Sequence, residues 1–310
     1  MLVKSWYPYL VFKLSFGWKD SITDYLVSID KQFSEDLQSA IVSESKIRQI
    51  LCSAEIDDGL TQYVPFRLIR PFFPELRGIQ DHKVNNEVKI LADNLFESRK
   101  PLYKFSQNST AILVHPDWCS YIQSNYQLVR GWVAWRWLQY MQIKNPNTPA
   151  IANKLFPPKE RQSLHRQTKY WRRIIELCQD VRCIYSGKLL SFDGSSLDHY
   201  LPWSFVAHDQ LWNLVPTSKA INSSKSNRIP DNTYFDNLVT IQHLGLTVFC
   251  SSQPQKIWGH YIEDYWIDLG LSSLDDLLSL ECLRNRYELK VKPLIALAIS
   301  QGFEYGWQCG

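Results

Sequence analysis

The 310-residue chain has no long apolar run, no paired cysteine motif and no strong charge of one sign. The lack of an apolar run of about 18 residues argues against a membrane-spanning helix. The seven cysteines are odd in number and scattered, which argues against a disulfide framework or a four-cysteine zinc site. A net charge of +3 is too small to predict a nucleic-acid partner by itself. We therefore expect a cytoplasmic protein with no structural zinc.

The N-terminus also lacks the features of a signal peptide. Lys13 interrupts its apolar stretch, and no small-residue cleavage site follows. No internal repeat or low-complexity tract is evident. What the chain does contain is 45% hydrophobic and 14% aromatic residues, with 12 tryptophans, so it can form a sizeable core.

Helical periodicity dominates both ends of the chain, which predicts a mostly helical protein. Prolines in residues 144–159 interrupt this pattern and mark the best candidate boundary. We expect a helical domain at 1–155 that recognises DNA or a partner, a basic helix with the chemical motif at 156–232, and a bracing helical region at 233–310. The predicted helices are 34–51, 83–98, 118–143, 160–180, 234–246, 256–269, 273–282 and 292–301, and 110–116 is a predicted strand.

Two segments combine arginine with aromatic residues, and each has two interpretations. The first is the proline-rich segment 65–77, which could contact phosphate or a partner, or could be a packed aromatic corner with solvated arginines. The second is the helix 118–143, which could stack on bases, although such a helix is more often buried all round. The arginines of the first segment are Arg67, Arg70 and Arg77, next to Phe66, Phe72 and Phe73.

The predicted helix 160–180 carries a basic stripe on one side. The stripe could follow a DNA backbone, where each neutralised phosphate adds affinity through counterion release. It could equally be an ordinary solvated helix face. The candidate DNA-contacting residues are Arg161, Arg166, Lys169, Arg172 and Arg173, supplemented by His165.

Residues 197–230 contain the residue types that phosphodiester hydrolysis needs. The pair Asp198–His199 offers a carboxylate for a hard cation and an imidazole that can deprotonate water. Asn213 and Asn222 follow, and their amides can bind a cation or hold a loop. The predicted elements are a strand-turn-strand at 183–190, a strand at 196–200, a loop at 202–210, a strand at 213–215 and a helix from 216 or 217 to 226.

These residues resemble the HNH, or ββα-metal, nuclease family, and most of all the HNH domain of CRISPR effector nucleases. The resemblance covers residues 183–232 and implies an α+β fold in which a small ββα-metal module is inserted near the C-terminal third. The matching positions, in order, are Asp198–His199, Pro202, Ser204–Phe205, Asn213, Asn222, Lys225–Ser226–Asn227 and Pro230.

The resemblance also implies a role for each residue. His199 would be the general base, and Asp198 and Asn222 would bind Mg²⁺, for which Mn²⁺ could substitute. Asn213 would hold the loop and His199 in place. Lys225 would meet a phosphate at the catalytic site or on the bound DNA, unless it is simply solvated. We expect His208 to be exposed rather than catalytic.

The expected function is a metal-dependent DNA endonuclease or nickase that leaves a 5′-phosphate and a 3′-hydroxyl. By resemblance, a bacterial anti-phage role is expected, with other subunits of a defence system as possible partners and an oligomer as a possible state. The alternatives are a homing-type or toxin nuclease and a non-catalytic DNA-binding subunit.

Overall fold

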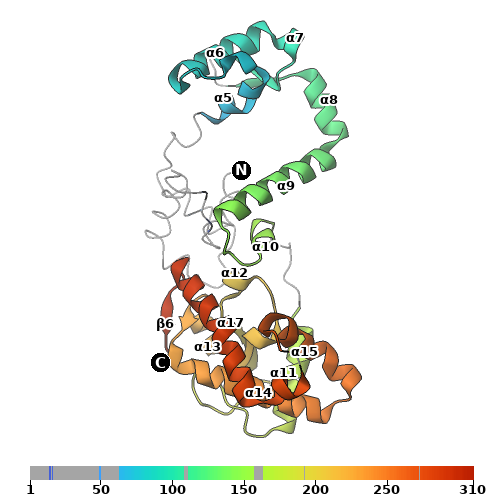
Figure 1. The fold of residues 1–310 in the computed structure, drawn as a ribbon, viewed down its shortest axis with the longest axis vertical. Coiled ribbons are helices and arrows are strands. Elements are labelled where there is room, and N and C mark those ends of the chain that lie inside the picture. Colours follow the sequence, from blue (N-terminus) through green and yellow to red (C-terminus); the bar gives the residue numbers. More distant parts are fainter. Residues whose placement is uncertain are drawn as a thin grey trace.

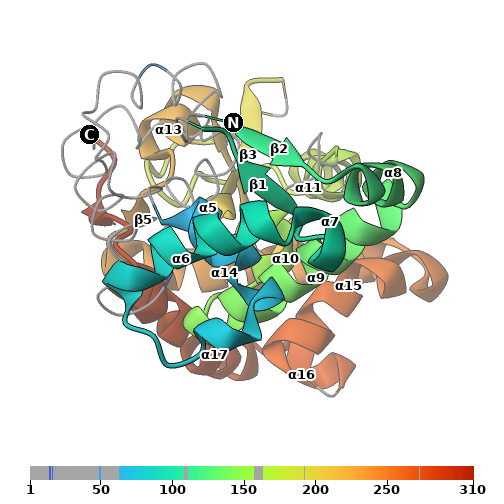
Figure 2. The same ribbon diagram turned by 90° about the horizontal axis from the view of Figure 1, so that it is seen from above.

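The computed structural model is mostly helical, with three small two-stranded sheets in the residues that it describes. Helices α5–α7 lie at one end and α11–α17 gather at the other, with α8 and α9 between them (Figure 1). Seen from above, α6 and α7 lie in front of the end that contains α14 and α17 (Figure 2). No helix in the described part is long and apolar enough to cross a membrane. The described residues are 14, 16, 49, 63–107, 111–156, 163–191, 193–271 and 273–310.

A small apolar core holds the first end of the molecule together. The predicted strand near 110–116 is confirmed as β2, which pairs with β1 in an antiparallel hairpin. Phe73 is buried and Arg70 donates to the carbonyl of Leu76 at 3.2 Å, so segment 65–77 is the packed aromatic corner. The elements are α5 (Val64–Ile69), the 3-10 turns Arg70–Phe72 and Pro74–Leu76, α6 (Asp81–Asn94), α7 (Phe96–Arg99), β1 (Tyr103–Phe105) and β2 (Ile112–Val114).

The predicted helix 118–143 is two helices, and the expectation that it is buried all round is wrong. It divides at Asn125 into α8 (Pro116–Ser124) and α9 (Tyr126–Lys144). Within α9 only Met141 is buried, while Trp132 is 64% exposed and Trp135 is 57% exposed. These tryptophans are exposed because α9 crosses between the two ends of the molecule rather than through a core (Figure 1).

The large core lies at the second end. It is built mainly by helices α11, α14, α15 and α17 around the β3–β4 hairpin. Helices α11 and α14 cross closely at Gly245, where an added Cβ would lie 2.9 Å from Tyr170 Oη. The helices are α10 (Ile151–Leu155), α11 (His165–Leu177), α12 (Trp203–Val206), α13 (Lys219–Lys225), α14 (Phe235–Ser252), α15 (Gln255–Leu269), α16 (Leu274–Leu278) and α17 (Leu280–Ser300); the 3-10 turns are Leu211–Asn213 and Asn232–Tyr234.

A strand pair followed directly by a helix forms the centre of this end. β3 (Ser195–His199) pairs with β4 (Leu214–Ser218) in antiparallel register, and α13 contacts both strands. The predicted helix start at 216 or 217 is wrong, because Pro216 lies in β4. Among the described strands β4 pairs only with β3, so the missing N–H of Pro216 need not cost a ladder bond. α13 begins after Ser218, whose hydroxyl accepts from the Ile221 N–H at 3.3 Å.

Two other predicted boundaries also differ. Residues 183–190 form a tight turn with one isolated bridge between Arg182 and Leu189, rather than two strands. The segments 273–282 and 292–301 belong to α16 and to one long helix, α17, which tolerates Pro293 in its interior. The chain ends in β6 (Tyr305–Trp307), which pairs in parallel with β5 (Ile229–Pro230). The division into domains at 155 and 232 stays a prediction.

Lys154 in α10 is buried, and its side-chain nitrogen has no hydrogen-bond partner in the described part of the chain. Its nitrogen lies 5.3 Å from the centre of the Phe205 ring, and burial lowers its pKa to about 7. Lys154→Met should therefore raise the free energy of unfolding at pH 7 by about 2–4 kcal/mol. Urea unfolding of both proteins measures this difference.

The pH dependence of this gain has a definite sign. The folded-state pKa of Lys154 lies below the unfolded value, so the unfolded chain binds more protons between about pH 7 and 10.5. The wild-type protein should gain stability relative to Lys154→Met as the pH rises from 7 to 9. An equal advantage of the variant at both pH values would contradict the burial of a free amine.

Candidate active site

His199 ends β3 and carries a carboxylate partner from the following loop. Its Nε2 lies 2.8 Å from Asp209 Oδ1, and the two side chains are 13% and 21% exposed. When Nε2 carries the proton and donates it to Asp209, Nδ1 keeps a lone pair. Nδ1 has no hydrogen-bond partner among the described residues. The ring is therefore oriented by a carboxylate and has one nitrogen available to accept a proton.

The loop that carries Asp209 is held from three sides. Asn213 is fully buried, accepts from the Leu201 N–H at 2.8 Å and donates to the Leu201 carbonyl at 2.9 Å. From α11, Gln167 donates to the Asp209 carbonyl at 2.8 Å. From α15, the Asp264 carboxylate accepts from the Leu211 N–H at 3.0 Å. Asn213 thus bridges the two backbone groups of Leu201, and the position of Asp209 is fixed by helices outside the hairpin.

Asp198 points to the buried side of β3, opposite to His199, as alternation along a strand requires. Its Oδ1 lies 3.1 Å from Lys225 Nζ, and its Oδ2 accepts from the Tyr185 hydroxyl at 2.6 Å. Burial raises the pKa of Tyr185 well above its ordinary value, so the phenol stays a donor. Both oxygens of Asp198 therefore have donors beside them.

The ammonium of Lys225 is enclosed by the hairpin. Lys225 is 0% exposed and Asp198 is 2% exposed, and Lys225 also donates to the His199 carbonyl at 2.6 Å. Burial lowers the pKa of Lys225, and the Asp198 carboxylate opposes that shift. The expectation of a solvated lysine is wrong. In this arrangement the ammonium does not reach a surface phosphate; it fixes the backbone that carries His199.

A divalent metal, which the sequence resemblance implies, would have to be held by Asp198 and Asn222. Asn222 uses its Nδ2 to donate to the Leu197 carbonyl at 3.0 Å, and its Oδ1 has no hydrogen-bond partner among the described residues. That oxygen suits a cation. Asp198, however, is buried and already neutralised by Lys225. Within the described residues no group of three or more His, Cys, Asp or Glu could hold a metal. As arranged, the expected pair of Asp198 and Asn222 does not fit a divalent ion.

The predicted DNA-contacting residues have different surroundings. Arg161 lies outside the described residues. The guanidinium of Arg166 donates to Asp264 at 3.0 Å and to the His260 carbonyl at 2.8 Å. Lys169 is exposed on α11. Arg172 and Arg173 flank Glu176 at 3.0 Å and 3.8 Å. Their contact with DNA stays a prediction.

Three residues of the site were missed in the sequence: Asp209, Tyr185 and Gln167. Asp209 lies ten positions after His199, in the loop that follows β3. An acidic residue so close to the histidine in the sequence could have indicated a partner for the ring. The sequence contains no comparable signal for Tyr185 or Gln167, which reach the site through tertiary packing. His208 is partly buried rather than exposed, and burial lowers its pKa.

Comparison with known proteins supports one family assignment for this part of the chain. Searches of curated proteins and of solved structures found no match. A family model described as HNH endonuclease matches residues 183–231. This range contains Tyr185, the β3–β4 hairpin, Asp209 and α13. The match makes the segment similar to HNH endonucleases, and such a domain indicates a nuclease acting on nucleic acid.

Proposed function

We propose that the chain is a DNA endonuclease whose hydrolytic centre is His199 supported by Asp209. The observation that carries the proposal is the 2.8 Å contact between these side chains, within the range that matches HNH endonucleases. Nδ1 of His199 takes a proton from the attacking water, and the imidazolium that forms is stabilised by the Asp209 carboxylate. The water attacks phosphorus in line, the bond from phosphorus to the 3′ oxygen breaks, and the departing oxygen takes a proton from solvent, which gives a 5′-phosphate and a 3′-hydroxyl.

The surroundings of His199 support this role. Asn213 holds the Leu201 backbone two residues after His199, while Lys225 holds the His199 carbonyl itself. Both contacts restrict the ring before substrate arrives, and preorganisation of this kind lowers the cost of reaching the transition state. One such centre cuts one strand. A break in duplex DNA therefore needs two protomers or two successive nicks.

HNH nucleases generally depend on a divalent metal, so the requirement for Mg²⁺ or Mn²⁺ belongs to this proposal although Asp198 does not fit the ion as arranged. We also propose, from the sequence resemblance alone, a nuclease of bacterial anti-phage defence that works with other subunits.

A second candidate, a non-catalytic DNA-binding subunit, is favoured by one observation. The buried pair of Lys225 and Asp198 removes the expected anionic metal ligand from the surface. Whether the protein cleaves DNA distinguishes this candidate from the nuclease.

Supercoiled plasmid incubated with the protein provides the test. With Mg²⁺ or Mn²⁺ we expect conversion to the relaxed form, and with EDTA we expect none. Equal conversion in EDTA would contradict the metal requirement. Plasmid that is bound but never relaxed, with either ion, would favour the non-catalytic subunit.

A further inference from the structure

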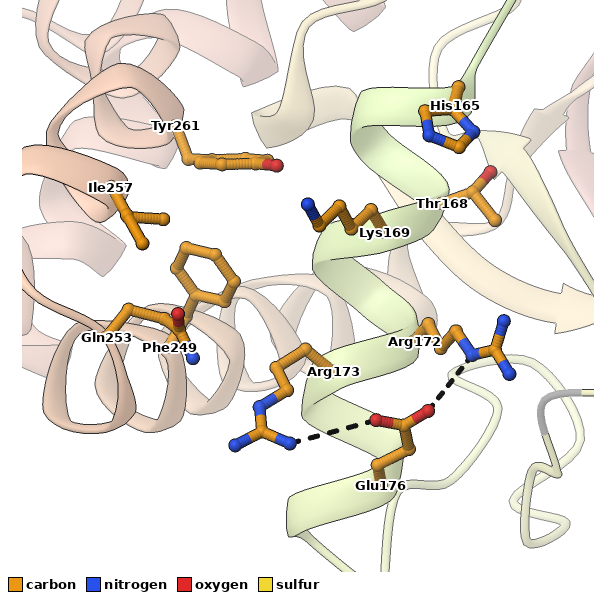
Figure 3. A pocket seen from close by; sticks show the side chains of 10 residues that line it. All are labelled: His165, Thr168, Lys169, Arg172, Arg173, Glu176, Phe249, Gln253, Ile257 and Tyr261. Carbon is orange, nitrogen blue, oxygen red and sulfur yellow. Dashed lines mark hydrogen bonds and ion pairs between the residues drawn. The ribbon is translucent and has the colours of Figure 1, made fainter.

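A pocket of about 800 Å³ lies beside the basic face of α11, apart from the His199–Asp209 pair. Such a volume is within the range typical of small-molecule sites. α11 contributes one wall, and the end of α14 and the start of α15 contribute the other (Figure 3). The lining residues are His165, Thr168, Lys169, Arg172, Arg173, Glu176, Phe249, Gln253, Ile257 and Tyr261.

The wall formed by α11 is cationic. Lys169, Arg172 and Arg173 line this wall, and the one carboxylate in the lining, Glu176, pairs with the two arginines. Figure 3 shows Lys169 and Arg173 pointing toward the side on which Phe249 and Tyr261 lie. Lys169 is exposed and has no hydrogen-bond or ion-pair partner within the described part of the chain. The wall thus offers an ammonium that no protein anion satisfies.

The opposite wall is mostly aromatic and aliphatic, with Gln253 as a polar side chain among its lining residues. The Phe249 and Tyr261 rings lie 4.9 Å apart with their planes tilted by 59°, and Phe249 is 3% exposed. Tyr261 also stacks on Tyr170 at 5.8 Å and has the Arg166 guanidinium 5.3 Å from its ring centre, and these contacts fix the ring. Ile257 adds an aliphatic surface that is 44% exposed. A ligand that contacts both walls needs an anionic group and a body that packs against aliphatic and aromatic side chains. A nucleotide has both, whereas an acidic peptide would leave the aromatic wall uncovered.

We infer that this pocket binds a nucleotide, with its phosphate at Lys169 and Arg173 and its base against Ile257 and Tyr261. The nucleotide is either free in solution or part of a nucleic-acid strand. The second source agrees with the proposed nuclease, because Gln167 on α11 contacts the Asp209 loop and its neighbour Thr168 lines the pocket. The pocket itself does not depend on hydrolysis.

Binding of a short fluorescein-labelled oligothymidine, followed by anisotropy in EDTA, tests the inference without cleavage. Lys169→Gln removes the ammonium, and Ile257→Glu places a carboxylate against the apolar wall. Each should weaken binding about 10-fold or more, because a charge-assisted contact is lost or opposed. Lys290→Gln removes an exposed lysine of α17 outside the pocket and should change affinity by less than about twofold. All three changed side chains are exposed, and thermal unfolding confirms that each variant is folded.

Competition then separates the sources. AMP that displaces the oligonucleotide supports a free nucleotide, and failure of AMP to compete supports a strand. Displacement by polyglutamate as effective as by AMP or unlabelled oligothymidine would overturn the inference, as would pocket variants that bind like Lys290→Gln. If the wild-type protein binds the oligonucleotide but never cuts DNA, and the pocket variants bind it more weakly, the proposed hydrolysis is refuted. The nucleotide pocket is then still supported.

Discussion

Lys225→Met should lower the free energy of unfolding by about 3–5 kcal/mol, because it leaves the Asp198 carboxylate buried without its cation. The Tyr185 hydroxyl alone cannot compensate a full negative charge. Urea unfolding of the variant measures the loss. The same network holds the His199 carbonyl, so the variant should also cut DNA more slowly than its folded fraction accounts for.

Two further variants test whether the loss of stability comes from the buried ion pair. Lys292→Met removes a lysine paired with Glu288 at 2.8 Å, but both side chains are 44% exposed, so the cost should stay below about 1 kcal/mol. Lys225→Met combined with Asp198→Leu removes both charges and should recover most of the stability. A single Lys225→Met variant as stable as Lys292→Met would show that the pair is not buried in the native protein.

His199→Ala should slow plasmid nicking by about 100- to 10,000-fold, the usual contribution of a general base. The side chain is 13% exposed and ends a strand, so the fold should survive, and the thermal unfolding midpoint checks this. Asp209→Asn should also slow nicking, because the neutral amide stabilises the imidazolium less. His260→Ala, on the exposed part of α15, should leave the rate unchanged.

The sequence predicted the part of the site that lies in one continuous stretch. Asp198–His199 lie on a strand and Asn222 on the following helix, as the residue pattern indicates. Asn213 was expected to begin a strand at 213–215 and lies instead in the 3-10 turn directly before β4. Neighbouring positions suffice for this because strand alternation and helical turns are local properties. The start of α13 was misplaced because Pro216 suits a first helical turn as well as an edge strand.

The tertiary contacts that bury Lys225 and expose α9 could not be predicted from the sequence. Lys225 lies three positions after Asn222, which suggests a shared helix face, yet its burial depends on Asp198 and Tyr185 from other segments. Similarly, the aromatic residues of α9 predict a core helix, but exposure depends on where the helix lies in the fold. Local pattern reports which residues could be buried, and tertiary packing decides which are.

Tertiary packing also brings together the two walls of the α11 pocket. The basic stripe was visible along α11, but nothing in the sequence joined it to Phe249 and Tyr261 on α14 and α15. The close crossing of α11 and α14 at Gly245 brings them together. A stripe that could have been a solvated face thereby becomes one wall of a candidate nucleotide site.

Chemical rescue tests most directly whether His199 is the base. His199→Gly leaves a space beside Asp209, and added imidazole can occupy it and accept the proton from water. We predict that the folded variant nicks plasmid at least about 100-fold more slowly than the wild-type protein and that imidazole restores part of the rate. Nicking by the folded variant at the wild-type rate without imidazole would contradict the account.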